Sequence, residues 1–359
     1  MKILIITNHS YMLYQFRKEL ISMLVEEGHD VTISTPFVGH EDDLRDLGTK
    51  LINTEVDRRG INPKTDLKLM NTYKNIINEI HPDKVITYSI KPNIYAGLVC
   101  RIKQIPYYIN VQGLGTAFQK EPLATIVSMM YKVALKKAKV VFFENQGNAQ
   151  VFIDRKIIKK DKIKVLNGAG VNLEKYQYNE YPEHKEIHFL YLGRIMKEKG
   201  VEELFEAFER LNSEYKNTKL DIVGFYEDEY ESKVNELVNQ GIAYYHGFQS
   251  DPVPYYEKVD CVVLPSYHEG MSNVLLEASS IGRPIITSNI HGCLEAVVNN
   301  KSGYLVNVQD SNDLYLKMKQ FYLLTQEEKV NMGKEGRKFM EEQFDKKKVV
   351  QETIKKIME

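Results

Sequence analysis

The chain contains 359 residues, of which 43% are hydrophobic and 27% are charged. This composition is ordinary for a globular protein and excludes a disordered chain, a collagen and a small disulfide-stapled scaffold. At roughly 100–200 residues per domain, the length predicts two domains. The formal net charge of −1 hides an asymmetry, because residues 1–165 carry 25 basic and 17 acidic side chains, whereas residues 166–359 carry 23 and 32. The opposite signs predict two lobes with different partners.

Cysteine usage and hydropathy bear on the cellular compartment. Cys100, Cys261 and Cys293 are too widely spaced for a zinc site or a disulfide framework, and they indicate buried thiols in a reducing compartment. No apolar run approaches the roughly 20 residues that span a bilayer. The first ten residues lack the hydrophobic region and cleavage site of a signal peptide. We therefore expect a cytoplasmic protein.

Apolar runs alternate with helical periodicity along the first half of the chain. Strands are predicted at Ile3–Ile6, Val31–Ser34, Leu51–Ile52, Lys84–Tyr88 and Tyr107–Val111. Helices are predicted at 14–27, where Gly28 serves as C-cap, near 41–47 and at 66–80. The strands are apolar throughout rather than alternating, so both of their faces should be buried. This pattern is typical of a parallel sheet covered by helices on both sides.

The same rhythm restarts in the second half. Strands are predicted at Ile187–Leu192, Lys219–Val223, Ile242–His246, Cys261–Leu264 and Ile285–Ser288, with helices at 201–211, 228–240 and 271–281. Two successive series of this kind predict an α/β protein with two Rossmann-like domains. We place the first domain at 1–170, a polar linker at 171–185, and the second domain at 186–340. The last segment, 341–359, is a charged helix expected to cross back to the first domain.

The loop 193–200 directly follows a predicted strand of the second domain. Ligands of open α/β sheets bind beyond the carboxyl ends of the strands, so this loop is a candidate site. Arg194 and Lys199 stand just before a helix, whose N-terminus favours an anion. A planar guanidinium together with a compact ammonium suits a diphosphate. The alternative is two solvated cations in a polar loop.

A second candidate loop spans 269–277, after the predicted strand that ends at Leu264. Glu269 lies in the loop, and Glu277 follows about two helical turns later. A carboxylate accepts two hydroxyl hydrogen bonds at once, which fits the vicinal diol of a ribose or a hexose. A solvent-facing role for Glu277 is disfavoured by its apolar neighbours. The backbone amides between the two acids begin a helix and can hold a phosphate oxygen: Gly270, Met271, Ser272 and Asn273.

Three other loops follow predicted strands. Gly247 and Phe248 form a turn whose backbone can read a planar base. Glu295, in the loop 291–297, is either a ligand-binding acid or a helix-start residue. In the first domain, the loop 112–118 contains a Gly-x-Gly pattern but lacks the third glycine of the dinucleotide fingerprint, so no nicotinamide cofactor is expected.

Together these residues resemble the retaining GT-B glycosyltransferases of family 4. The resemblance spans nearly the whole chain, and its motifs are the loops at 193–200 and 246–248 and the segments 264–278 and 282–297. The segment 8–20 and the Gly-Leu-Gly of the first domain are similar to bacterial enzymes that extend polyprenyl-diphosphate-linked sugars for capsule, exopolysaccharide or glycoprotein glycans. The resemblance implies two Rossmann-like domains that face each other across a cleft.

The resemblance also implies a role for each matching residue. Glu277 would bind the donor ribose, and Glu269 the hydroxyls of the donor hexose. Arg194 and Lys199 would hold the diphosphate, which makes them, with Glu269, the catalytic candidates. The amides of 270–273 would contact sugar and phosphate, and Gly247 with Phe248 would meet the base. Many family members carry a histidine in the first-domain loop, but this loop has none, so Gln112, Gly113 and Gly115 are only acceptor-side candidates.

The activity implied is retaining transfer of a hexose or N-acetylhexosamine from a UDP-sugar to a hydroxyl of a polyprenyl-diphosphate-linked sugar. No metal or other cofactor is expected, because the cations and helix N-termini can stabilise the leaving diphosphate. Two alternatives remain open. A UDP-sugar 2-epimerase of the same architecture would convert the sugar without an acceptor, and a nucleotide-sugar sensor would bind the donor without turnover.

A membrane partner is predicted from the basic half of the chain. Residues 120–139 mix apolar residues and five lysines at helical spacing, and a second cluster of six cations lies within 155–164. Such segments lie on anionic membrane surfaces, so we expect peripheral docking on the inner face of the cell membrane. The alternative is a buried helix with snorkelling lysines. Nucleic acid is not expected as a partner, because the other half is acidic.

Overall fold

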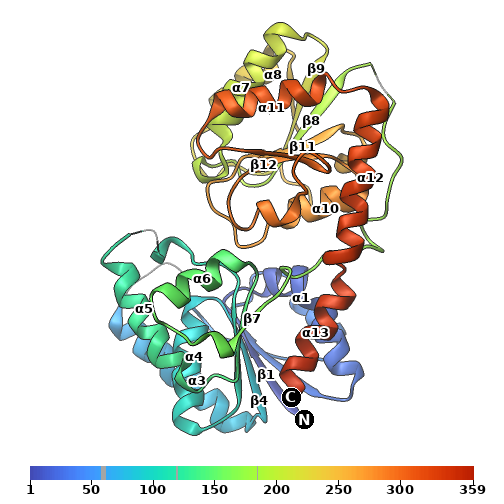
Figure 1. Ribbon diagram of the computed structural model, residues 1–359. Coiled ribbons are helices and arrows are strands. Elements are labelled where there is room, and N and C mark those ends of the chain that lie inside the picture. The colour runs from blue at the N-terminus through green and yellow to red at the C-terminus, as the bar shows by residue number, and fades with distance from the viewer. Residues whose placement is uncertain (58–61, 119, 184) are drawn as a thin grey trace. The chain divides into compact units, whose positions relative to one another are not determined.

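The computed structural model describes residues 1–57, 62–118, 120–183 and 185–359 (Figure 1). The chain divides into two compact units: the first comprises Met1–Ala169 with Lys347–Glu359, and the second comprises Gly170–Lys346. Residues 171–185, expected to be a linker, belong to the second unit, where Tyr176 and Tyr181 are buried. The C-terminal segment joins the first unit from Lys347 onward rather than from 341.

The first unit is built on a parallel sheet whose strands follow the order β3-β2-β1-β4-β5-β6-β7. The strands are β1 (Lys2–Ile6), β2 (Asp30–Thr35), β3 (Lys50–Asn53), β4 (Lys84–Tyr88), β5 (Tyr107–Val111), β6 (Val140–Phe143) and β7 (Ile163–Val165). The helices are α1 (Ser10–Glu26), α2 (Glu41–Asp46), α3 (Pro63–Ile80), α4 (Ile90–Lys103), α5 (Leu123–Ala134), α6 (Gln146–Asp154) and α13 (Lys346–Met358).

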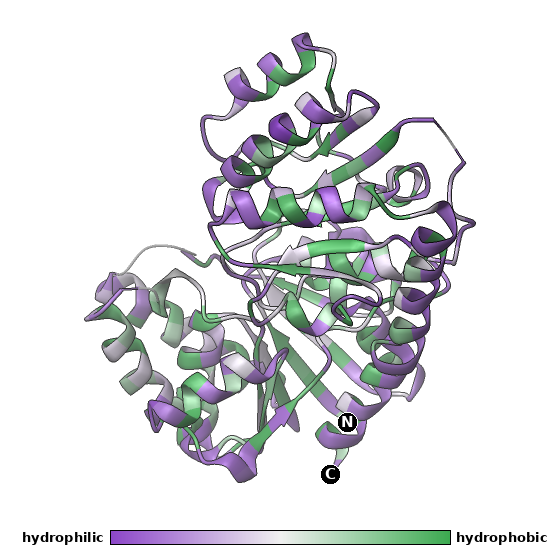
Figure 2. Cartoon of the chain, turned by 45° about the horizontal axis from the view of Figure 1, so that its top comes forward, coloured by the Kyte–Doolittle hydropathy of each residue, from purple (hydrophilic) through white to green (hydrophobic). Residues whose placement is uncertain are grey.

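Both faces of the first sheet are buried, as the apolar strands predict. Successive residues of β1 enter different clusters: Ile3 packs with residues of α1 and α13, and Leu4 with residues of α3, α4 and α5. In Figure 2 the strands are mostly green, whereas the helices alternate between green and purple. Helix α3 starts three residues earlier than predicted, because the Asn62 side chain accepts hydrogen bonds from the amides of Lys64 and Thr65.

The second unit repeats the architecture with a parallel sheet ordered β10-β9-β8-β11-β12-β13. Its strands are β8 (Ile187–Leu192), β9 (Thr218–Val223), β10 (Ala243–Tyr245), β11 (Cys261–Leu264), β12 (Ile285–Ser288) and β13 (Gly303–Val306). Its helices are α7 (Val201–Glu214), α8 (Glu231–Asn239), α9 (Val253–Glu257), α10 (Asn273–Ile281), α11 (Ser311–Tyr322) and α12 (Gln326–Gln343). Helix α7 packs beside α11, and α10 beside α12 (Figure 1).

These two sheets confirm the prediction of an α/β protein with two Rossmann-like domains. Among the residues that the structure describes, each buried cluster lies within one unit, so each unit has its own hydrophobic core. All three cysteines are buried free thiols, with Cys100 in the first unit and Cys261 and Cys293 in the second. Among the described residues no helix is long and apolar enough to cross a membrane.

Candidate functional site

The order of strands in the second sheet marks where a ligand can bind. From β8 the chain proceeds to β9 and β10 on one side, and then returns to β11, β12 and β13 on the other. The loops after β8 and β11 therefore diverge at a topological switch point, which is the ligand site of open α/β sheets. The candidate loop 193–200 is the first of these, and the candidate segment 269–277 begins in the second, 265–272, and continues into α10.

The two loops approach each other closely. Gly200 has φ +70°, and a Cβ on it would lie 2.1 Å from the carbonyl oxygen of Pro265. The backbone N–H of Tyr267 donates to the carbonyl of Glu198 at 2.8 Å. A third loop, which follows β12, joins them, because a Cβ on Gly292 would lie 2.7 Å from the carbonyl oxygen of Glu269. Glycine at 200 and 292 thus permits three loops to meet at the end of the sheet.

Lys199 and Glu269 meet at this junction. The Lys199 Nζ lies 2.5 Å from Glu269 Oε1, and the Ser266 hydroxyl donates to the same oxygen at 2.9 Å. Their side chains are only 18% and 13% exposed. The structure therefore brings together two of the three predicted catalytic residues, a cation and a carboxylate, at the switch point.

Arg194 takes a different direction from Lys199. Its side chain is 44% exposed, and its Nη1 lies 3.4 Å from Glu227 Oε2 in the loop after β9. The backbone at Arg194 is fixed, because the Tyr191 hydroxyl donates to the Arg194 carbonyl at 2.6 Å. Asp228, which follows Glu227, accepts a hydrogen bond from the backbone amide of Lys197. The helix predicted at 228–240 begins only at Glu231, so both acids lie in the loop.

The predicted amide cradle at 270–273 is partly occupied. Helix α10 begins at Asn273 with Ser272 as its N-cap, and no side chain caps it. The Ser272 amide donates to the Gly292 carbonyl at 2.8 Å, so it serves the junction of loops rather than a ligand. Met271 and Ser272 are buried, whereas Gly270 and Asn273 are half-buried.

Glu277 lies on α10 and is buried. The Tyr256 hydroxyl of α9 donates to its Oε2 at 2.9 Å. Burial raises the pKa of Glu277, and hydrogen bonding from Tyr256 opposes that rise. Glu269 and Glu277 therefore have different partners in the protein, Lys199 and Ser266 for the first and Tyr256 for the second. Tyr176 also hydrogen-bonds Glu277, and since a carboxylate has about four acceptor positions, the two tyrosines do not exhaust them.

The turn at Gly247 and Phe248 follows β10 at the same end of the sheet. The Gly224 amide donates to the Gly247 carbonyl at 2.8 Å, which ties the turn to the loop after β9. Phe248 is 57% exposed, and it stands edge-on to Phe225, which is 44% exposed, with 6.2 Å between ring centroids. Phe225 was not identified from the sequence, where its position just after β9 was the available signal.

In the first unit, Gln112, Gly113 and Gly115 follow β5. The two glycines and Gln112 are half-buried or exposed, and Gly115 has φ +64°. The switch point of this sheet lies between β1 and β4, where the Ser89 hydroxyl donates to Asn8 Oδ1 at 2.8 Å.

Nearby, sequence reasoning also missed a buried ion pair between Arg17 of α1 and Glu144, which follows β6. Burial raises the pKa of Glu144. Only the Arg17 partner offsets that rise, so the pair holds a carboxylate in an apolar setting near the end of the first sheet.

Helix α5 of the first unit presents apolar side chains to solvent. Ala124, Val127, Ser128, Tyr131 and Ala134 form its buried face. Three residues at helical spacing on its outer face are about half exposed: Ile126 (48%), Met129 (56%) and Val133 (49%). Lys132, Lys136 and Lys137 are exposed beside them. Lys162 of the second basic cluster donates to the carbonyls of Lys136 and Ala138, so the two clusters adjoin.

Two family models match the chain. The model described as "Glycosyl transferases group 1" matches residues 174–339, and the model described as "Glycosyl transferase 4-like" matches residues 2–145. A relative from Campylobacter jejuni, named N,N'-diacetylbacillosaminyl-diphospho-undecaprenol alpha-1,3-N-acetylgalactosaminyltransferase, is 29% identical over 340 residues, with 89% of this chain and 88% of that protein covered. The capsular polysaccharide biosynthesis glycosyltransferase CapM of Staphylococcus aureus is 28% identical, with 78% and 79% covered.

Solved structures share the whole architecture. A glycosyltransferase from Rickettsia africae superposes with a TM-score of 0.81 at 18% identity, covering 99% of this chain and 97% of that one. The Anabaena protein Alr3699/HepE in complex with UDP gives a TM-score of 0.81 at 15% identity and covers both chains completely. These likenesses confirm the predicted fold, two Rossmann-like domains of the GT-B type.

Proposed function

We propose that this chain is a glycosyltransferase of family 4 that moves a hexose or N-acetylhexosamine from a UDP-sugar to a polyprenyl-diphosphate-linked sugar. The observation that carries this proposal is the pairing of Lys199 with Glu269 at the switch point. The name of the Campylobacter relative, which specifies a diphospho-undecaprenol acceptor, supports the lipid-linked acceptor. The UDP in the Anabaena structure supports a UDP-sugar donor.

The proposed reaction uses the charges of these loops. As the bond between the anomeric carbon and the diphosphate breaks, negative charge builds on the leaving UDP and positive charge on the sugar. Lys199 and Arg194 stabilise the diphosphate in the transition state, in place of a metal ion. Glu269 accepts hydrogen bonds from the hexose hydroxyls, and Glu277 from the ribose.

The proposed stereochemistry is retention. The acceptor hydroxyl attacks the anomeric carbon from the face that the diphosphate leaves. An oxygen of the departing phosphate takes the acceptor proton, so the products are UDP and the extended lipid-linked sugar. Binding of the acceptor is assigned to the first unit, with Gln112, Gly113 and Gly115 as candidates.

The test is UDP release from a panel of UDP-sugars, with and without a short-chain polyprenyl-diphosphate-sugar. We expect release only when one donor and the lipid are both present, at an unchanged rate in EDTA. The product bond, read by NMR, should keep the donor's anomeric configuration. Sugar conversion without UDP release would instead identify an epimerase, and donor binding without turnover would identify a sensor. A Lys199→Ala preparation excludes contaminating hydrolases.

Peripheral docking on an anionic membrane is proposed for the first unit. Its support is the outer face of α5, where half-exposed Ile126, Met129 and Val133 stand among lysines. This combination suits an interfacial helix, whose apolar side chains enter the acyl boundary while its cations face anionic headgroups. A lipid-linked acceptor stays in the membrane, so the enzyme must reach it there. The loop at 112–115 leads into α5 within a few residues.

Co-sedimentation with vesicles tests this docking. We expect binding to anionic vesicles that weakens in high salt, and little binding to zwitterionic ones. Changing Ile126, Met129 and Val133 together to serine should weaken binding at least tenfold. A matched control replaces Leu316 and Leu323, exposed apolar residues of the second unit, by serine. Equal binding to both kinds of vesicle would show that the lysines do not contribute to docking. Full binding by the triple variant would show that α5 is not the docking helix.

A further inference from the structure

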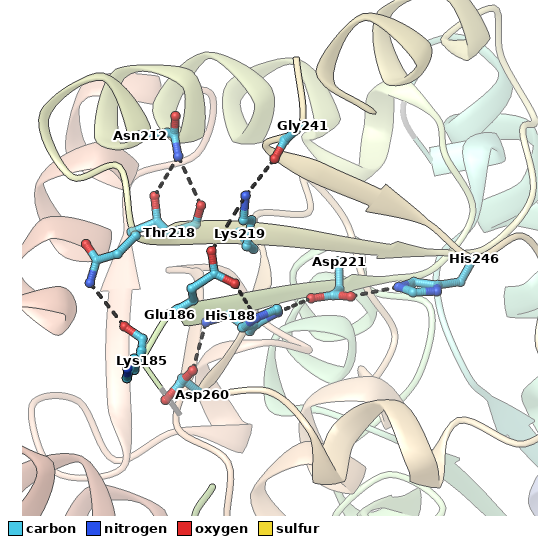
Figure 3. A network of polar contacts seen from close by, with 11 residues as sticks. Lys185, Glu186, His188, Asn212, Thr218, Lys219, Asp221, Gly241, His246 and Asp260 are labelled. Atoms are coloured by element: carbon cyan, nitrogen blue, oxygen red, sulfur yellow. Dashed lines mark hydrogen bonds and ion pairs between the residues drawn. The ribbon is translucent and has the colours of Figure 1, made fainter. Parts of the chain in front are cut away.

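A carboxylate lies between two imidazoles inside the second unit (Figure 3). Asp221, on β9, has a side chain that is only 12% exposed. The His188 Nδ1 lies 2.8 Å from its Oδ2, and the His246 Nε2 lies 2.7 Å from its Oδ1. Both carboxylate oxygens are thus bound by ring nitrogens, which at these distances donate their protons to the carboxylate.

The Asp221 carboxylate is an unusual group on an inner strand. Asp221 pairs in register with Leu190 of β8 and Tyr244 of β10, and burying a carboxylate there is costly unless it is hydrogen-bonded. An apolar side chain would fill the same position at no electrostatic cost, so stability alone does not account for Asp221. What the carboxylate does accomplish is to hold His246 in one orientation.

His246 opens the turn that contains Gly247 and Phe248. Its amide continues the sheet by donating to the Ile222 carbonyl at 2.9 Å, and its carbonyl accepts from Gln249 Nε2 at 2.7 Å. Gly247 has φ +66°, and its carbonyl is bound by the Gly224 amide. The turn is therefore fastened to β9 by its backbone and, through Asp221, by a side chain.

His188 fastens Asp221 from the other side. Its backbone amide donates to Asp260 Oδ2 at 2.8 Å, and its ring is nearly parallel to that of Tyr244, with centroids 6.3 Å apart. The hydrogen bond with Asp221 raises the pKa of His188, against the effect of burial. With an imidazole fixed on each side, the Asp221 carboxylate has one stable position.

The turn presents an aromatic pair at the ligand-binding end of the sheet. Phe248 and Phe225 are both about half exposed, with ring planes at 61°. The Phe225 carbonyl accepts from the Ile195 amide at 2.9 Å, so its backbone adjoins that of Arg194. Exposed aromatic rings beside the cation assigned to the diphosphate suit the base and the diphosphate of one nucleotide.

We propose that Asp221 is a positioning residue for the nucleobase that the resemblance places at this turn: through His246 it holds Phe248 beside Phe225, and the two rings form the platform for the base. This inference rests on the proposed function and extends it. Stacking on an aromatic ring is tolerant of base identity. The platform therefore supplies affinity for a nucleoside diphosphate rather than discrimination between uracil and other bases.

Calorimetric binding of UDP to the full chain tests the platform. Phe225→Ala and Phe248→Ala should each weaken UDP binding about tenfold to a hundredfold. Both should leave the affinity for inorganic diphosphate and the melting temperature unchanged, because these side chains are exposed. The control is Phe37→Ala, which changes an exposed phenylalanine of the first unit. Unchanged UDP affinity in both platform variants would overturn the assignment.

A double-mutant cycle tests the positioning role of Asp221. Asp221→Asn should weaken UDP binding several-fold in the wild-type background and have no further effect in Phe248→Ala, since both changes act on one platform. His246→Gln should behave in the same way, and it replaces Asp221→Asn if that variant does not fold. Asp43→Asn, which alters an exposed histidine–aspartate pair of the first unit, is the control. Equal weakening in both backgrounds would reject the positioning role.

The experiments distinguish an error in the proposed donor from an error in the proposed platform. If the wild-type chain binds none of UDP, ADP, GDP and dTDP, the proposal of a nucleotide-sugar donor is wrong, and the assignment of the platform is wrong as well. If UDP binds and the phenylalanine variants bind it equally well, only the platform is wrong. If another nucleotide binds better than UDP and the variants lose that binding, the platform stands and the donor is corrected.

Discussion

At the scale of single residues, the sequence located the candidate site but not all of its contacts. Lys199 and Glu269 follow the two strands that flank the switch point, so the topology alone places them near each other. Arg194 pairs with Glu227, and Glu277 is hydrogen-bonded by Tyr256 and Tyr176. Those pairings depend on how neighbouring loops and helices pack, which the spacing of residues within one motif does not reveal.

Single substitutions separate the two cations of the loop after β8. Lys199→Ala and Arg194→Ala should each lower kcat/KM about a hundredfold, since one donor aimed at developing negative charge contributes roughly 3 kcal/mol to transition-state stabilisation. Lys197→Ala is the matched control, because Lys197 is an exposed lysine of the same loop and pairs with Glu202. Steady-state kinetics gives kcat/KM for all three variants. An Arg194→Ala enzyme with intact turnover would rule out the role assigned to Arg194.

At the scale of elements, apolar runs predicted most of the strands, but β6, β7 and β13 were missed, although β6 is continuously apolar. Strands such as β1, β8 and β11 lie in the middle of their sheets, so burial on both faces makes them continuously apolar. Strand β7 has three residues with a lysine at its centre, and it lies at an edge where only half-burial is required. Its pairing with β6, rather than its own composition, makes it a strand.

The joint between the loop after β8 and helix α7 depends on Gly200. A glycine is visible in the sequence, but the approach of Pro265 to it is not. Gly200→Ala should therefore destabilise the chain by about 3 kcal/mol or more, combining left-handed strain with a backbone clash, and should lower kcat by displacing Lys199. Chemical denaturation and steady-state kinetics measure the two effects.

Gly241 provides the control for this joint. It has φ +69°, but a Cβ there would meet nothing within 4 Å. Gly241→Ala should thus cost only the left-handed strain, about 1 kcal/mol, with activity unchanged. If the two variants were equally stable, the close approach to Pro265 would not constrain the joint.

At the scale of the whole molecule, composition and charge predicted two lobes, and two compact units are present. Their bounds differ from the expected ones because burial of Tyr176 and Tyr181 attaches residues 170–185 to the second unit. A polar composition with a proline suggested a linker there. Only packing against the second core, which includes hydrogen bonds from buried Arg283 to Asn179 and Glu180, overrides that pattern.

Buried cysteines in each unit allow ligand effects to be assigned to one of them. In partial denaturant, UDP at a hundred times its dissociation constant should slow thiol labelling of Cys261 and Cys293 about a hundredfold, because it stabilises the unit that binds it by roughly 2.7 kcal/mol. Labelling of Cys100, in the core of the first unit, should not change. Mass spectrometry of the labelled peptides reads each cysteine separately, and equal protection of all three would show that the units open together.

The return of residues 347–359 to the first unit sets an order of events during synthesis. Val349, Val350, Ile354 and Ile357 belong to the same core cluster as Ile3, Ile5 and Ile33. Ribosomes add about 5–20 residues per second, so this core lacks its last layer for roughly 10–40 seconds after residue 169 is made. The second unit, which contains its whole core within 170–346, can finish folding first. The half of the protein that emerges earlier is thus the half completed later.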